Sequence, residues 1–278
     1  MYPVHTNMGK IHVRKAYQIP EASRTAKGTN IVNIIEMLPD EKITALISID
    51  AFNDDDYLTM VTKQGVIKRT LLKEYEYQRR GGKIAINLDE GDELVFVRCT
   101  NGDGEIMIAT ADGNCVRFEE SGARAMGRTA RGVRGIKLRE GDFVVGVSVV
   151  DETKEIVTIT EGGYGKRTSF EDFRVMKHRG GFGVTCHKIS EKTGKLAGIA
   201  TVSDDNDLMM ITTSGTIIRT PVSGIPTYSR TAGGVIMMRL ADDQKIANFT
   251  AVAHEEEPTE ETDTAPEGEA TVVENANE

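Results

Sequence analysis

Residues 78–83, with the sequence QRRGGK, have the composition of a phosphate-binding loop. Arginine presents a planar fork of N–H donors, lysine presents a mobile point charge, and glycine lets the main chain approach a ligand that a larger side chain would hold away. A solvated surface turn has the same composition, so the stretch alone is weak evidence. Variants of it recur along the chain, and that recurrence favours a binding role.

Each variant follows a hairpin signal. A T-x-x-G turn beside short β-like runs occurs five times, and such a turn is typical of two antiparallel strands. Two further apolar runs, separated by a polar turn, follow each hairpin and its loop. The pattern therefore predicts four strands per repeat, as in a propeller. The five turns are residues 6–9, 62–65, 110–113, 160–163 and 212–215.

We predict an all-β fold, a propeller-like disc of about five four-stranded repeats, because a repeat of this size buries its sheet faces only against its neighbours. A disordered acidic tail is expected to follow the disc. The disc is expected to span residues 1–253 and the tail residues 254–278. The expected repeats are approximately residues 1–50, 51–99, 100–150, 151–202 and 203–253.

The charge of the chain is unevenly distributed. Its 278 residues carry a formal net charge of −9 at pH 7, which argues against a polyanionic ligand if the charge is spread evenly. Residues 254–278, however, contain ten acidic residues and neither lysine nor arginine. The remaining 33 acidic side chains nearly balance the 34 basic ones, so the disc is close to neutral and can carry one basic stripe.

Several classes of protein are disfavoured by the composition. No apolar run approaches the roughly 18 residues of a membrane helix, and no signal segment is evident at the N-terminus, so a cytoplasmic location is expected. Cys99, Cys115 and Cys186 form no C-x-x-C pair, which disfavours a disulfide framework and a zinc site. Cys186, next to His187, is expected to be a buried structural thiol. We expect no metal and no cofactor.

The basic loops form a series in phase with the hairpins. An arginine lies 15 residues after four of the five turn glycines and 16 after the other. Three residues later a second cation follows in the first three repeats, whereas the last two have Phe182 and Gly233. We expect a curved cationic track that is strongest over the first three repeats. The five arginines are Arg24, Arg80, Arg128, Arg179 and Arg230, and the second cations are Lys27, Lys83 and Arg131.

At this point whole phrases of the chain resemble the C-terminal domain of the DNA gyrase A subunit. The resemblance covers residues 1–253, and the related domain in the A subunit of topoisomerase IV is the near alternative. It implies a β-pinwheel, a disc of four-stranded blades that wraps DNA around a basic rim and thereby lets gyrase introduce negative supercoils. The matching phrases are YQIPEASRTAKG (17–28), RAMGRTARGVRGIKL (124–138), GGYGKRT (162–168) and MMITTSGTIIRT (209–220).

The resemblance implies double-stranded DNA as ligand, and as partners the rest of the gyrase A subunit together with the gyrase B subunit in a heterotetramer. We expect this chain to lack catalytic residues, because it has no G-x-x-x-x-G-K-[ST] phosphate loop and no recurring catalytic set. The ATP-dependent topoisomerase chemistry is then expected in other domains and subunits. The candidate DNA-binding residues are Arg24, Lys27, Arg79, Arg80, Lys83, Arg124, Arg128, Arg131, Arg134, Lys177, Arg179 and Arg230.

Three alternatives stay open at this stage. A propeller that serves as a scaffold for protein partners fits the near-neutral disc. The acidic tail either aids solubility or competes with DNA for the rim, since a tethered polyanion has a high effective concentration. The third concerns a further set of cations, which either contact DNA or pair with carboxylates between blades. These cations end the second hairpin strands at Lys68, Arg69, Arg117, Lys166, Arg167 and Arg219.

Two departures from the family pattern limit the comparison. The family's hallmark box, QRRGGKG, lies in the first of six blades, whereas here QRRGGK is followed by Ile84 and lies in a repeat that the family counts as third. Only five repeats are present. We therefore expect a C-terminal piece or a split product whose box-carrying blade lies upstream of Met1. Whether residues 78–83 replace the box is not decided by the sequence.

Overall fold

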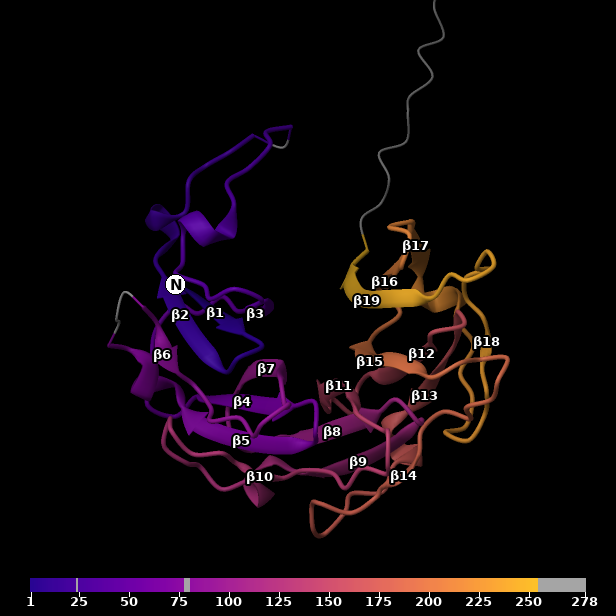
Figure 1. Ribbon diagram of the computed structural model, residues 1–278. Coiled ribbons are helices and arrows are strands. Elements are labelled where there is room, and N and C mark those ends of the chain that lie inside the picture. Colours follow the sequence, from indigo (N-terminus) through magenta and orange to yellow (C-terminus); the bar gives the residue numbers. More distant parts are fainter. Residues whose placement is uncertain (24, 78–80, 255–278) are drawn as a thin grey trace, which may run out of the picture.

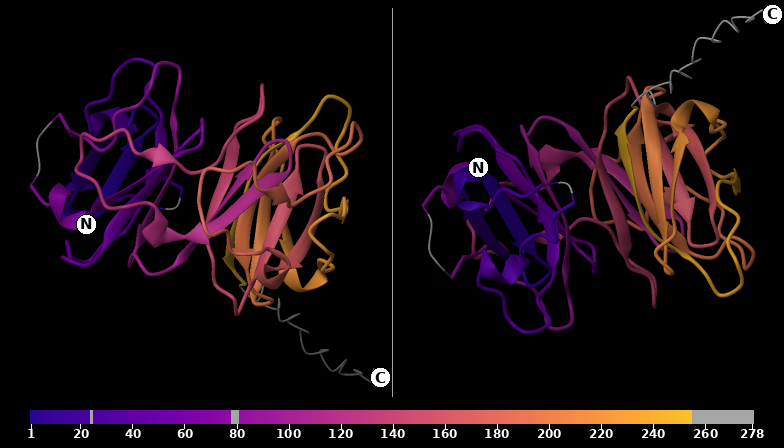
Figure 2. Two further views of the ribbon diagram at one scale, coloured as in Figure 1. Left: turned by 90° about the horizontal axis from the view of Figure 1, so that it is seen from below. Right: turned by 90° about the horizontal axis from the view of Figure 1, so that it is seen from above.

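The computed structural model describes residues 1–23, 25–77 and 81–254. The predicted all-β fold is confirmed, because the described residues form β-strands and short 3-10 turns. Five sheets follow one another along a crescent that is open between the first and the last sheet (Figure 1). Seen from below and above, the strands run obliquely across the thickness of this crescent (Figure 2). Three predicted site residues, Arg24, Arg79 and Arg80, lie outside the described residues, as does the tail from residue 255.

The five predicted hairpins are present and form the middle of each sheet. Each turn glycine has a positive φ, from 74° to 85°, and its N–H donates to the carbonyl of the turn threonine at 2.9–3.0 Å. Glycine is needed there because other residues rarely adopt this conformation. The hairpins are β1 (Tyr2–Thr6) with β2 (Lys10–Arg14), β4 (Tyr57–Thr62) with β5 (Val66–Leu71), β8 (Glu105–Thr110) with β9 (Asn114–Glu119), β12 (Glu155–Thr160) with β13 (Tyr164–Ser169), and β16 (Asn206–Thr212) with β17 (Ile217–Pro221).

A third strand of each repeat pairs with the first hairpin strand and lies closest to the centre of the crescent (Figure 1). A 3-10 turn follows each second hairpin strand. The inner strands are β3 (Ile43–Leu46), β7 (Leu94–Thr100), β11 (Val144–Val149), β15 (Leu196–Val202) and β19 (Ile246–Ala253). The turns are η1 (Ala16–Gln18), η3 (Leu72–Tyr75), η4 (Glu120–Gly122), η5 (Phe170–Asp172) and η6 (Val222–Gly224).

The outer strand of each sheet comes from the following repeat, so a repeat and a blade are not the same unit. Each outer strand has only two residues, shorter than the apolar run that predicted it. Four sheets have four strands, and the last, β17-β16-β19, has three in the described chain. The outer strands are β6 (Lys83–Ile84) on β2, β10 (Val133–Arg134) on β5, β14 (Val184–Thr185) on β9 and β18 (Val235–Ile236) on β13.

The first repeat differs because the described chain contains no earlier blade to receive its outer strand. A strand expected at residues 31–35 is wrong: Ile31–Asn33 form the 3-10 turn η2, which Asn30 caps by accepting from the N–H of Val32 at 3.2 Å. Ile35 is instead buried, and Arg14 Nε donates to the carbonyl of Ile34 at 2.9 Å. An outer strand thus forms only where a neighbouring sheet edge offers hydrogen-bond partners.

The core consists of four apolar clusters, one between each pair of neighbouring sheets. Between the first two blades, for example, Ile11 and Val13 of β2 pack in one cluster with Leu58 and Met60 of β4. Equivalent clusters join the second blade to the third, the third to the fourth and the fourth to the fifth. Burial of sheet faces between neighbours fixes the curvature and places the outer strands on the perimeter.

Candidate nucleic-acid interface

The basic loops cross from one blade to the outer edge of the preceding blade, and a glycine makes each crossing possible. A Cβ atom at Gly132, Gly183 or Gly234 would lie 2.6, 2.1 or 2.4 Å from a main-chain oxygen of the strand being crossed. All three have φ between 71° and 97°. At Gly28, in the first repeat, a Cβ would meet nothing within 4 Å. The loops of the third, fourth and fifth repeats are therefore held closely against the main chain of the preceding blade.

The predicted phase is wrong in the second repeat. Gly82 has a φ of 75° and precedes Lys83, which pairs with Ile11, just as Gly132 precedes Val133, which pairs with Ile67. The arginine series lies four residues before this glycine in the other repeats, but that place is Gln78 in the second. Lys83 is consequently a strand residue and not the counterpart of Arg131. The cause is a loop two residues shorter, which counting from the hairpin cannot detect.

Two arginines of the series use part of their guanidinium groups to hold their loops in place. Arg179 donates from Nε to the carbonyl of Gly122 at 2.8 Å and from Nη1 to that of Arg134 at 2.7 Å. Arg230 donates from Nη1 to the carbonyl of Thr185 at 3.0 Å. Both side chains keep further N–H donors, so they connect a loop to its neighbour and still present positive charge at the perimeter.

Two buried lysines also fasten these loops from below. Lys68 Nζ donates to the carbonyls of Ala85, at 2.6 Å, and Arg128, and Lys166 Nζ donates to the carbonyl of Ser229 at 2.6 Å. Burial lowers the pKa of Lys68 and of Lys166 to about 8. Neither side chain is accessible, which excludes both from direct contact with DNA in this structure.

Three hairpin arginines join neighbouring blades. The sequence left open whether these cations contact DNA or pair between blades. Arg117 Nη1 donates to the carbonyl of Phe170 in the next repeat at 2.6 Å, and Arg167 Nε donates to that of Ile225 at 2.7 Å. Both also pair with carboxylates. Arg69 is buried and donates to the carbonyl of Gly102 at 2.8 Å. These cations belong to the framework.

The other predicted cations are accessible to different degrees. Lys27, Arg124, Arg134 and Lys177 are exposed, and within the described residues none of them has a carboxylate within 4.0 Å. The remaining members are more engaged. Arg131 forms an exposed ion pair with Asp89, Lys83 lies over the ring of Tyr77 at 5.6 Å, and Arg128 is half-buried.

A second series of cations was missed by sequence reasoning. Lys137, Lys188 and Arg239 each lie five residues after the crossing glycine, and all three are exposed. Residues 137 and 188 also donate their N–H groups to the tip of the next loop, at Gly181 (2.8 Å) and Ala232 (3.2 Å). In the sequence they lie at the ends of the apolar runs GIKL, CHKI and MMRL, a pattern that predicts strand ends and not a binding series. The fixed distance from the glycine is the signal that could have found them.

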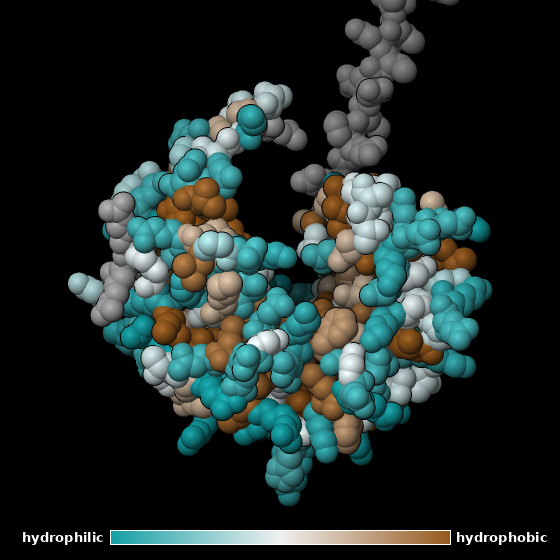
Figure 3. Space-filling view, viewed as in Figure 1, coloured by the Kyte–Doolittle hydropathy of each residue, from teal (hydrophilic) through white to brown (hydrophobic). Residues whose placement is uncertain are grey.

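Polar side chains dominate the visible perimeter of the crescent, and brown, apolar patches lie between the blades and near the centre (Figure 3). The outer strands and crossing loops lie on this perimeter (Figure 1), so the exposed cations of these segments are spread along one curved path. Phosphate groups spaced along a bent duplex are the ligands that such a path suits, since cations at intervals position a backbone without reading bases.

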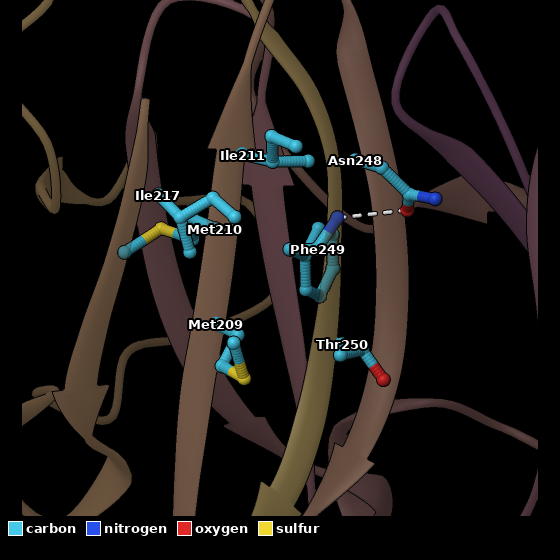
Figure 4. A pocket seen from close by; sticks show the side chains of 7 residues that line it. All are labelled: Met209, Met210, Ile211, Ile217, Asn248, Phe249 and Thr250. Carbon is cyan, nitrogen blue, oxygen red and sulfur yellow. Dashed lines mark hydrogen bonds between the residues drawn. The ribbon is translucent and has the colours of Figure 1, made fainter. Parts of the chain in front are cut away.

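An apolar groove on the last blade is lined mainly by Met209, Ile211, Ile217 and Phe249, and its polar contribution includes Asn248, which accepts from the N–H of Phe249 at 2.7 Å (Figure 4). It lies on a sheet face that no further blade covers among the described residues, and no charged side chain lines it. Among the described residues, no three His, Cys, Asp or Glu side chains are grouped to hold a metal.

Comparison with known proteins agrees with this architecture. The family described as "DNA gyrase C-terminal domain, beta-propeller" matches residues 9–50, 56–101, 104–151, 154–203 and 206–253. The chain belongs to this family. Four of the five matched segments each contain one whole hairpin of the crescent, and the first begins at the turn glycine Gly9 and contains the second strand of its hairpin, so the family and the fold are established together.

Relatives and solved structures extend the comparison. The DNA gyrase A subunit of Staphylococcus epidermidis is 44% identical over 91% of this chain, and that of Staphylococcus aureus is 42% identical over 98%. The chain spans only 28% and 31% of these two relatives. The crystal structure of the C-terminal domain of DNA topoisomerase IV matches with a TM-score of 0.84 at 27% identity, covering 91% of this chain and 79% of that one.

A structure of the DNA gyrase A C-terminal domain matches with a TM-score of 0.78 at 26% identity, covering 90% of this chain and 81% of that one. The two structural neighbours share the fold about equally, whereas the curated relatives at 42–44% identity are gyrase subunits. Gyrase is therefore better supported than topoisomerase IV. No helix among the described residues is long and apolar enough to cross a membrane.

Proposed function

We propose that this chain is a non-catalytic module that binds double-stranded DNA and bends it around the perimeter of the crescent. The observation that carries the proposal is the placement of exposed, unpaired cations beside successive outer strands, from Arg124 and Arg134 at β10 to Lys188 after β14 and Arg239 after β18. A curved row of point charges matches phosphates on the inner side of a bent duplex.

The energetics require several such contacts. Bending a site of roughly 20–30 bp by 40–90° costs about 1–6 kcal/mol. Each phosphate that is neutralised releases condensed counterions, so binding through about 6–10 contacts offsets this cost at moderate salt. The described perimeter holds enough accessible cations: Lys27, Arg124, Arg134, Lys137, Arg139, Lys177, Lys188 and Arg239.

We further propose that the module acts as the C-terminal part of a gyrase A subunit, where it supports ATP-dependent negative supercoiling. Its partners would be the remainder of that subunit, together with the gyrase B subunit in a heterotetramer, in the cytoplasm. The relatives are about three times as long as this chain, so regions that this chain does not match are available for the strand-cleaving chemistry. The ATP-dependent step would lie in other domains and subunits of the complex.

Salt dependence is the direct test of binding. Affinity for a duplex of mixed sequence should fall roughly 10³–10⁵-fold between 50 and 200 mM salt, with little sequence preference. Closure of nicked circles with the protein bound then tests wrapping, because a bend of fixed hand changes the linking number of the ligated product. Affinity that barely responds to salt would point to a protein-binding scaffold. Ligated circles with no linking change would refute wrapping even if binding holds.

A further inference from the structure

We propose that the boundary between the second and third blades carries a composite phosphate-binding site, made by Lys137 and Arg139 and held by the ring of Phe182. This inference rests on the proposed DNA-binding function and assigns one anchoring point within it. Segment 135–139 leaves outer strand β10, and the loop with Phe182 precedes outer strand β14, so the site lies where two perimeter segments meet (Figure 1).

Phe182 occupies the loop position that carries a cation in other repeats. It directly precedes the crossing glycine Gly183, as Lys27 precedes Gly28 and Arg131 precedes Gly132. Counting loop cations alone therefore suggests that the positive track weakens at the fourth repeat. The structure shows that two cations from the preceding repeat stand at this place instead: Nζ of Lys137 is 4.7 Å and Cζ of Arg139 is 5.8 Å from the centre of the ring.

The equivalent boundary between the first and second blades has the opposite arrangement. There the loop supplies the cation, Arg131, and the preceding turn supplies an acid, Asp89, with which it forms an ion pair. Asp89 and Arg139 are equivalent, since each lies two residues after the residue that bonds the loop tip, Asn87 or Lys137. The charge at the first boundary is thus neutralised within the protein, whereas at the second boundary it remains available.

Three properties make the second boundary a site rather than a chance grouping. Lys137 and Arg139 are exposed, and no carboxylate of the described residues lies within 4.0 Å of either. Phe182 is 45% exposed, so its ring is accessible at the surface where both cations lie near it. The backbone beneath is fixed, because the N–H of Lys137 donates to the carbonyl of Gly181 at 2.8 Å.

An aromatic face attracts cations through its quadrupole, so the ring restricts two long side chains that would otherwise move freely. Restricting them before binding lowers the ordering cost at the moment of contact. The ligand chemistry that suits a lysine beside an arginine is the phosphodiester backbone of duplex DNA. Phe182 is accordingly a positioning residue, and Lys137 and Arg139 make the contact.

The test compares variants of the full chain in a salt titration with a linear mixed-sequence duplex. The double variant Lys137→Gln, Arg139→Gln should lose between one and two phosphate contacts, which corresponds to a slope shallower by roughly 0.9–1.8 and an affinity lower by about 8- to 60-fold near 0.1 M salt. Phe182→Ala keeps both charges, so we expect an affinity loss of about 3- to 10-fold with little change of slope. Phe182→Trp should restore binding.

The inner side of the crescent provides a matched control. Arg98 lies on inner strand β7 with its guanidinium 4.8 Å from the ring centre of Phe96, the same pair chemistry away from the perimeter. Arg98→Gln should leave affinity and slope unchanged. Melting temperatures confirm that all variants fold, as expected for exposed positions 137 and 139.

The outcomes separate the two proposals. If the unmodified chain binds DNA weakly and without salt dependence, the proposed function fails. If the unmodified chain binds as expected but the double variant matches it in slope and affinity, the phosphate site alone is refuted. A Phe182→Ala variant that bends DNA less, beside a double variant without effect, would also refute the site and identify the ring as a wedge between bases.

Discussion

Replacing Arg117 with methionine tests whether the hairpin arginines join blades rather than bind DNA. The side chain is 3% exposed and uses all three of its nitrogens: Nε pairs with Glu105 at 2.6 Å, Nη2 pairs with Glu152 at 2.5 Å, and Nη1 donates to the carbonyl of Phe170 at 2.6 Å. Methionine fills a similar space and donates no hydrogen bond. The third blade would thus lose a connection to the fourth.

The expected cost follows from what remains behind. Removing one partner of a buried ion pair destabilises by about 3–5 kcal/mol, and an unpaired buried carbonyl adds to this cost. Glu152 is 71% exposed and regains water, whereas Glu105 is only 26% exposed. We therefore expect the lower end, about 3 kcal/mol, which corresponds to a fall of roughly 6–12 °C in Tm for a chain of this size.

Unfolding in urea and in a thermal scan measures this loss of stability. A DNA titration, at a temperature where the variant and the unmodified protein are both folded, measures whether Arg117 also contributes to DNA binding. Lys63→Met is the comparison, because Lys63 and Glu93 are 43% and 45% exposed where they pair, so its removal should cost less than about 1 kcal/mol. Two results would contradict the reasoning: a loss below about 1 kcal/mol for Arg117→Met, or unchanged stability with weaker DNA binding and a shallower salt slope.

Two further predictions concern the crossing loops and acid stability. Gly183→Ala should detach outer strand β14, since its Cβ would lie 2.1 Å from the carbonyl oxygen of Cys115. Gly28→Ala meets no neighbour and should cost only about 1 kcal/mol of backbone strain. Hydrogen exchange at β14 and melting temperatures compare the two variants, and equal effects would contradict the prediction. Burial lowers the pKa of His187 to about 4 and that of His5 to about 3, so the unfolded chain binds more protons than the folded chain below pH 6.5. The free energy of unfolding should therefore fall as the pH drops from 6.5 towards 4. His187→Gln should make this fall less steep, and an unaltered pH profile of the variant would contradict the prediction.

The fold was predictable because its signals are local and repeated. Each of the five T-x-x-G turns that lie between β-like runs forms a hairpin, and apolar runs mark the strands around it. The exchange of outer strands was not predictable from the same signals, since the run after each loop has the same composition whichever blade it pairs with. Residues 31–35 show this: an apolar run without an available sheet edge forms a 3-10 turn instead.

The candidate interface was predictable in part. Exposed cations such as Arg124 and Arg134 are placed beside an outer strand, as the loop series indicated. Burial cannot be inferred from a cation in a strand, so the roles of Lys68 and Lys166 inside the blades required the structure. Likewise, the pairing of Phe182 with two cations depends on contacts across a blade boundary that no spacing along the chain describes.

The borrowing of outer strands gives the crescent a direction of weakness. Loss of the fifth repeat would remove β18 and leave the fourth blade with three strands, and each later loss would strip the blade before it in the same way. Unfolding from the C-terminal end is therefore transmitted backwards along the chain, whereas unfolding of the first repeat takes no strand from the second. Tension applied to the last blade would therefore unfold the blades one after another, starting from the C-terminal end.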